Sequence, residues 1–140
     1  MLKERIDREA PDAVLMLGQA GGRTEITAER YGRNVKDCAA PDCDGELCRG
    51  VPVAEGGEAI LESPLALRLS PPLGLSESAG GYVCNCLCYN ALRGFEGPCA
   101  FIHVPYCEEN KGAKERKPFM LLGEIVRQIR EAVRTVAEAL

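Results

Sequence analysis

The chain lacks the long apolar run that a membrane-spanning helix needs. No stretch of about 18 or more apolar residues occurs in its 140 residues. Residues 1–9 are charged throughout and do not form the apolar core of a signal peptide. We therefore expect no membrane association and a cytoplasmic location, where thiols stay reduced.

The sequence also has little that would bind nucleic acid or metal. The net charge is -4, and a nucleic-acid-binding face is usually basic. The chain has one histidine, and its eight cysteines form no Cys-x-x-Cys pair, so their spacings match no common zinc site. We expect neither nucleic acid nor a metal or other cofactor as a partner. The interpretation of the eight cysteines as a disulfide framework is weakened because no signal peptide is recognisable. A cysteine-rich metal or redox module stays open as a third hypothesis.

What is present is an alternation of strand-like and helix-like segments. The apolar run at residues 13–17 has strand length and suits a central strand covered on both faces, and residues 99–105 predict another buried strand. From Leu122 to Leu140, apolar residues recur at helical spacing. A single domain spanning residues 1–140 with this alternation is typical of an α/β layered fold.

Shorter elements are expected between these segments. We predict a helix end at 1–10, a helical stretch that begins at 59–61 and continues through 65–69, an extended segment at 73–76, a helix at 84–92 and an irregular connection at 34–58. Residues 26–31 fit either a helix or a strand.

The segment from Ala79 to Asn85, AGGYVCN, is the most informative one. Two glycines allow a sharp turn and a close approach to a ligand. Cys84 would then lie at the N-terminus of the 84–92 helix, where the helix dipole stabilises a thiolate and lowers its pKa. This arrangement presents a nucleophile. A buried, inert thiol in a loop of small, packed residues is an equally good interpretation.

His103 is the one histidine, and it lies near the end of the strand-like run at 99–105. Catalytic groups gather at strand ends in open α/β sheets. A core histidine bonded to a backbone carbonyl is nevertheless the better interpretation of an isolated histidine. A reactive cysteine and a histidine make the minimal pair of a thiol hydrolase, and an acidic group would orient the imidazole.

Three segments resemble motifs of the type I pyroglutamyl peptidases, also called pyrrolidone-carboxylate peptidases. They are GQAGGRTEITAER at 18–30, AGGYVCN at 79–85 and FIHVP at 101–105. They look like the family's glutamate, cysteine and histidine motifs, in the family's order. The C-terminal residues 117–120, KPFM, and the helix after them also resemble the family's ending, so the resemblance runs from about residue 11 to residue 140.

The resemblance implies a cysteine exopeptidase that removes N-terminal pyroglutamate from peptides through an acyl-enzyme. Cys84 would be the nucleophile, and His103 would deprotonate the thiol and then protonate the leaving amine. Glu29 would hold the imidazole in the right tautomer, and backbone N–H groups around Cys84 would stabilise the oxyanion. Without the motif, Glu29 would be interpreted as an exposed carboxylate on a helix or loop.

The resemblance also implies residues that bind the substrate. Gln19 would pair with the lactam of the pyroglutamyl group, and Tyr82 and Val83 would form apolar walls around its ring. Taken alone, Gln19 is a polar loop residue facing water.

For the fold, the resemblance implies a three-layer α/β/α sandwich with a mixed, mostly parallel central sheet. The family's first strand and its Gly/Phe-rich loop are not recognisable in residues 1–12, so we expect a chain that is N-terminally truncated relative to the family. A sheet edge exposed in this way would favour a homo-oligomer. A non-catalytic truncated relative, or a partner subunit of the same fold, is the alternative to the enzyme.

Overall fold

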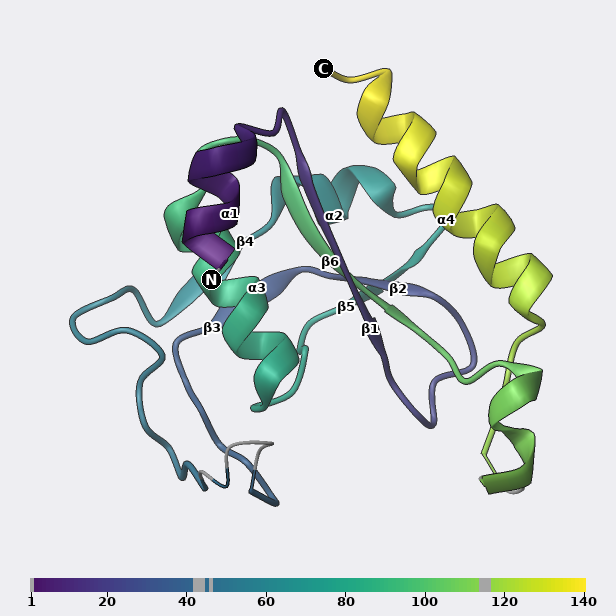
Figure 1. Ribbon diagram of the computed structural model, residues 1–140, viewed down its shortest axis with the longest axis horizontal. Helices are drawn as coiled ribbons and strands as arrows, with labels where there is room; N and C mark the ends of the chain where they lie inside the picture. The colour runs from purple at the N-terminus through teal and green to yellow at the C-terminus, as the bar shows by residue number, and fades with distance from the viewer. Residues whose placement is uncertain (1, 42–44, 46, 114–116) are drawn as a thin grey trace.

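The computed structural model describes residues 2–41, 45, 47–113 and 117–140, and Figure 1 shows their arrangement. A four-stranded sheet lies at the centre. Its strands, in spatial order, are β1 (Val14–Gln19), β6 (Cys99–Val104), β2 (Thr27–Glu29) and β5 (Gly74–Ser76). β1 runs parallel to β6 and β2 runs parallel to β5, whereas β2 and β6 are antiparallel. The sheet is therefore mixed and mostly parallel, as predicted.

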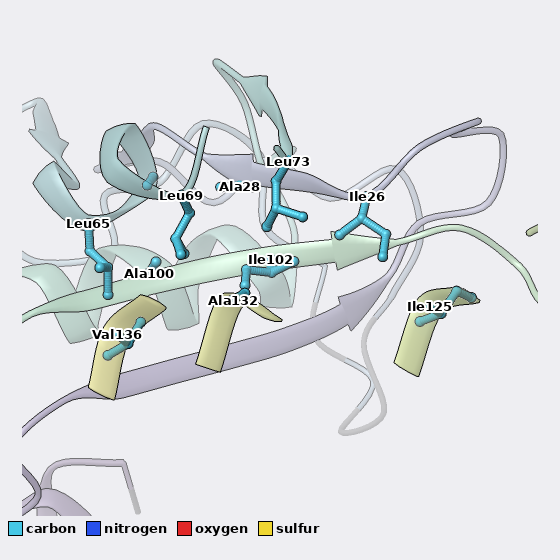
Figure 2. Close-up of a cluster of buried hydrophobic side chains, with 11 residues drawn as sticks. Ile26, Ala28, Leu65, Leu69, Leu73, Ala100, Ile102, Ile125, Ala132 and Val136 are labelled. Atoms are coloured by element: carbon cyan, nitrogen blue, oxygen red, sulfur yellow. The ribbon is translucent and has the colours of Figure 1, made fainter. Parts of the chain in front are cut away.

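Helices cover both faces of this sheet. Helices α2 (Pro64–Leu69) and α4 (Leu122–Ala137) pack on one face, where they bury a cluster that includes Leu69, Ile102 and Val136 (Figure 2). On the other face, α3 (Val83–Gly94) contributes Cys88 and Ala91 to a second cluster, and Leu2 of α1 (Leu2–Glu9) packs against that cluster. The expected three-layer α/β/α sandwich is thus confirmed.

Two smaller elements flank the sandwich. Strands β3 (Tyr31–Arg33) and β4 (Ile60–Glu62) pair antiparallel in a separate two-stranded sheet, and a 3-10 helix, η1, spans Glu108–Ala113. The residues left open between helix and strand, 26–31, divide between β2 and β3. In the part of the chain that the structure describes, no helix is long and apolar enough to cross a membrane.

The prediction that a helical stretch begins at residues 59–61 is wrong. Pairing with β3 holds Ile60–Glu62 in an extended conformation. The helix begins only at Pro64, because the buried Ser63 caps it: the Ser63 hydroxyl accepts from the Ala66 N–H at 3.0 Å and donates to the Cys99 carbonyl at 2.7 Å.

The prediction that residues 13–17 form a central strand covered on both faces is also wrong. β1 lies at the edge of the four-stranded sheet, and the Leu17 side chain is 56% exposed. The central, buried position belongs to β6, where residues 99–103 are all buried. Because β6 is hydrogen-bonded to β1 on one side and to β2 on the other, the backbone of His103 is held firmly in the sheet.

Candidate active site

The pairing of β2 with β6 brings a carboxylate and an imidazole together. In the antiparallel register, Thr27 lies opposite His103 and Glu29 lies opposite Phe101. Residues that face each other across two strands share a face of the sheet, so Glu29 lies diagonally across from His103. Nδ1 of His103 is 2.7 Å from Oε1 of Glu29, and both side chains are buried.

Glu29 is fully enclosed, and both of its oxygens have partners. Nη2 of Arg23 lies 2.7 Å from Oε1, and the Ser76 hydroxyl donates to Oε2 at 2.6 Å. Burial by itself raises the pKa of Glu29, but the hydrogen bonds from His103 and Ser76 and the charge of Arg23 hold that pKa below its ordinary value. Glu29 is therefore an ionised carboxylate at neutral pH. It is buried, and not the exposed helix or loop residue that would be inferred without the motif.

The tautomer of His103 follows from this pairing. Because a carboxylate can only accept hydrogen bonds, Nδ1 of His103 carries the proton. Nε2 is then the ring nitrogen that can take up a proton. The carboxylate partner replaces the backbone carbonyl expected for an ordinary core histidine.

Gly18 provides the room for the His103 ring. It lies beside His103 in the β1–β6 register. A Cβ atom at Gly18 would come within 2.8 Å of a Phe101 ring carbon and 3.1 Å of Cδ2 of His103. The two rings pack against each other with their centroids 4.9 Å apart, so a side chain at residue 18 would displace both of them.

Cys84 occupies the predicted place at the start of a helix. It is the second residue of α3, after the N-cap residue Tyr82. The turn before the helix depends on glycine, because Gly80 has a φ of 85° and a Cβ at Gly81 would lie 2.6 Å from the Asp37 carbonyl oxygen. The half-buried Cys84 packs against the cluster that contains Phe101. It therefore lies on the same face of the sheet as His103.

The predicted net lowering of the Cys84 pKa is wrong, although the backbone N–H at the helix start does act in that direction. Burial raises the pKa of this thiol and outweighs the opposing effect of its own backbone N–H. The charge of Glu29 adds to the rise, and the charge of Arg23 counteracts it. Cys84 therefore stays a thiol at neutral pH and needs a base to become a nucleophile.

Asn85 fixes the start of α3 against β3. Its side chain is buried, and Oδ1 accepts from the Arg33 N–H at 2.9 Å. Nδ2 donates to the carbonyls of Arg33 and Val35 at 2.8 and 2.9 Å. These three bonds set the position of Cys84, the preceding residue.

Two of the three predicted binding residues share a cavity. Tyr82 and Val83 line a cavity of about 250 Å³ together with Lys36, Cys38, Cys48, Val53, Cys86 and Asn90. Gln19 does not line this cavity. It is exposed at the end of β1, where its Nε2 donates to Oδ1 of Asn110 at 2.8 Å. The structure thus places Tyr82 and Val83, but not Gln19, in the wall of this cavity.

Two other thiols, those of Cys88 and Cys99, are more deeply buried than Cys84. Burial raises the pKa of Cys88 to about 12 and that of Cys99 to about 11, so both are inert core groups. Among the described residues, no three His, Cys, Asp or Glu side chains are grouped so that they could hold a metal ion.

The sequence motifs indicate no separate role for Arg23, Ser76 or Asn85, which contribute to the site. Arg23 and Asn85 lie within the segments that resemble family motifs, and this was a usable signal. Ser76 lies in neither segment, and its bond to Glu29 spans 47 residues of the chain.

Comparisons with known proteins point to one family. The family model described as pyroglutamyl peptidase matches residues 1–139. The pyrrolidone-carboxylate peptidase of Thermococcus kodakarensis is 38% identical over 153 residues, which cover 100% of this chain and 74% of that protein. The one from Lactobacillus johnsonii is 34% identical, covering 99% of this chain and 70% of that protein. The crystal structure of pyroglutamyl peptidase I from Bacillus amyloliquefaciens superposes with a TM-score of 0.84 at 28% identity, covering 96% and 70% of the two chains.

Proposed function

Since this chain belongs to the pyroglutamyl peptidase family, we propose that it is a cysteine exopeptidase that hydrolyses the bond after an N-terminal pyroglutamyl residue. Its substrates are then peptides that begin with pyroglutamate. The observation that carries this proposal is the buried pair of Glu29 and His103, 2.7 Å apart, on the sheet face against which Cys84 packs.

Cys84 attacks the carbonyl carbon that joins the pyroglutamyl group to the next residue. Nε2 of His103 takes the thiol proton, and the sulfur forms a bond to that carbon. Backbone N–H groups at the start of α3 stabilise the oxyanion of the tetrahedral intermediate. When the intermediate collapses, the C–N bond breaks and the imidazolium protonates the leaving amine.

Water completes the cycle. His103 removes a proton from a water molecule, which attacks the thioester carbonyl. The C–S bond breaks, free pyroglutamate leaves, and the proton returns from His103 to the Cys84 sulfur. Both half-reactions use the same two side chains, and no cofactor takes part in this scheme.

Glu29 keeps His103 ready for both steps. Its ionised carboxylate holds the proton on Nδ1 and stabilises the imidazolium that forms when Nε2 accepts a proton. This support is needed because the raised pKa of Cys84 leaves the thiol protonated at neutral pH.

We assign recognition of the pyroglutamyl ring to Tyr82 and Val83, which precede Cys84 and line one cavity. Gln19 would bind the lactam by exchanging its present hydrogen bond to Asn110 for one to the substrate. A nucleophilic thiol works only while reduced, and this requirement supports our expectation of a cytoplasmic location.

Hydrolysis of a fluorogenic L-pyroglutamyl amide by the folded, reduced protein tests the proposal. We expect turnover by the wild type and a loss of roughly 1,000-fold or more for Cys84→Ala, which removes the nucleophile. Cys107→Ala is the matched control, because Cys107 is another half-buried thiol, and it should retain wild-type turnover. A folded wild type that does not hydrolyse the amide would overturn the proposal.

A further inference from the structure

Arg23 reaches from the loop between β1 and β2 into the site. Its Nη2 lies 2.7 Å from Oε1 of Glu29 and 3.4 Å from the carbonyl oxygen of Ser78. Its Nη1 donates to the hydroxyl of Thr27. The side chain is only 23% exposed, so its charge is partly shielded from water and acts strongly on its neighbours.

We propose that Arg23 is a positioning residue that neutralises Glu29 and ties it to the segment that delivers Cys84. The role rests on the proposed function, because it concerns the same three side chains. Ser78 belongs to the connection between β5 and α3. A single guanidinium thus joins the carboxylate that orients His103 to the chain segment that leads to the nucleophile.

The positive charge of the Arg23 guanidinium compensates the buried charge of Glu29. Oε1 of Glu29 lies 2.7 Å from both Nδ1 of His103 and Nη2 of Arg23, whereas Oε2 accepts a hydrogen bond from Ser76. Neutral donors satisfy the hydrogen-bonding capacity of a buried carboxylate but leave its charge uncompensated. Arg23 supplies the compensating charge and leaves the bond to His103 in place.

The charge of Arg23 also acts on the nucleophile. The groups that face the pair of Arg23 and Glu29 are His103 on β6, Ser76 on β5 and the thiols of Cys84 and Cys88 on α3. The carboxylate disfavours a thiolate at Cys84 and the guanidinium favours it. Removing Arg23 would leave Cys84 exposed to an uncompensated negative charge.

The pH dependence of Cys84 alkylation by iodoacetamide, followed by peptide mass spectrometry without any substrate, tests this role. In Arg23→Gln we expect roughly tenfold slower alkylation of Cys84 at pH 7 and a profile displaced to higher pH, because the thiolate fraction falls. Arg23→Lys keeps the charge and should stay within about threefold of the wild type. Arg30→Gln is the matched control, since Arg30 pairs with Glu62 at 2.8 Å on the surface, and it should leave the profile unchanged.

A wild-type alkylation profile in folded Arg23→Gln would overturn the proposal. If Arg23→Gln does not fold at 25 °C, Arg23→Lys decides the matter: wild-type-like alkylation supports the proposal, and a tenfold loss in the folded protein contradicts it. Turnover of the pyroglutamyl amide is measured separately. A wild type without turnover would overturn the proposed function, whereas the alkylation profiles alone decide the role of Arg23.

Discussion

The two halves of the site are built in opposite ways. Glu29 and His103 lie on neighbouring strands and are buried, and among the described residues no buried side-chain polar atom lacks a hydrogen-bond partner. Cys84 is half-buried at a helix terminus, and the adjacent Val83 is 52% exposed. The half that controls the proton is enclosed in the sheet, and the half that must meet a substrate is open to solvent.

Burial acts on both halves, but with different results. It raises the pKa of Glu29 and that of Cys84. At Glu29, three charged or polar partners reverse the effect, whereas at Cys84 the backbone N–H and the charge of Arg23 do not. The comparison shows why the nucleophile depends on its base: the carboxylate is ready in the resting protein, and the thiolate is not.

Removing the base should cause the largest loss of activity. In His103→Ala the thiol of Cys84 has no side chain to take its proton, and we expect kcat/KM for the pyroglutamyl amide to fall by about 1,000-fold or more. Steady-state kinetics check this. Turnover by His103→Ala within tenfold of the wild type would show that another group acts as the base.

Neutralising the orienting carboxylate should have the next largest effect. Glu29→Gln keeps the shape of the side chain but removes the charge that supports the imidazolium, so we expect a loss of roughly 100-fold or more in kcat. Glu62→Gln is the control because it changes a carboxylate of a surface ion pair. Equal activities of the two variants would contradict the role of Glu29.

Crowding the His103 imidazole from the neighbouring strand β1 should reduce activity somewhat less than neutralising Glu29 does. The Cβ of Gly18→Ala would push on the rings of Phe101 and His103, and a misplaced catalytic group can cost about 100-fold in rate. Gly123→Ala in α4 is the control, because a Cβ there meets no atom within 4 Å. We expect lower kcat for Gly18→Ala alone, and unchanged kinetics would show that the rings can adapt.

Removing the hydrogen bonds that hold the start of α3 should mainly lower the stability of the protein. Asn85→Ala leaves three backbone groups of β3 and its extension without their partner, so we expect the free energy of unfolding to fall by about 3 kcal/mol. Asn90→Ala removes one exposed bond, to the Cys86 carbonyl, and should cost under about 1 kcal/mol. Urea denaturation compares the two variants. Equal losses in the free energy of unfolding would mean that Asn85 does not hold α3 against β3.

The smallest effect is the acid sensitivity that Glu29 gives to folding. Its pKa is lower in the folded chain than the ordinary value of 4.5, so the unfolded state binds a proton at higher pH than the folded state does. The stabilisation is complete above the unfolded pKa and is lost as the pH falls through the folded pKa. Urea denaturation at pH 7 and below pH 4.5 should therefore show a smaller acid-induced loss in Glu29→Gln than in the wild type. An equal loss in both would contradict the lowered pKa.

Local patterns in the sequence were sufficient for part of this site. Two glycines before Cys84 predicted its helix-start position, and an apolar run predicted the strand that carries His103. The pKa direction of Cys84 was mispredicted because Cys84 packs against a cluster that includes Met16 and Phe101, which are distant in the chain. Residues 59–61 and the edge position of β1 were mispredicted for the same reason, since strand pairing decides both.

The most direct test of Cys84 as the nucleophile is the identity of the acylated residue. The wild type and Glu29→Gln are mixed with excess pyroglutamyl ester and quenched with acid, and fragmentation mass spectrometry locates any covalent adduct. We expect one pyroglutamyl group on the sulfur of Cys84, formed more slowly in Glu29→Gln. An adduct on Cys86, or hydrolysis at an undiminished rate by Cys84→Ala, would contradict it.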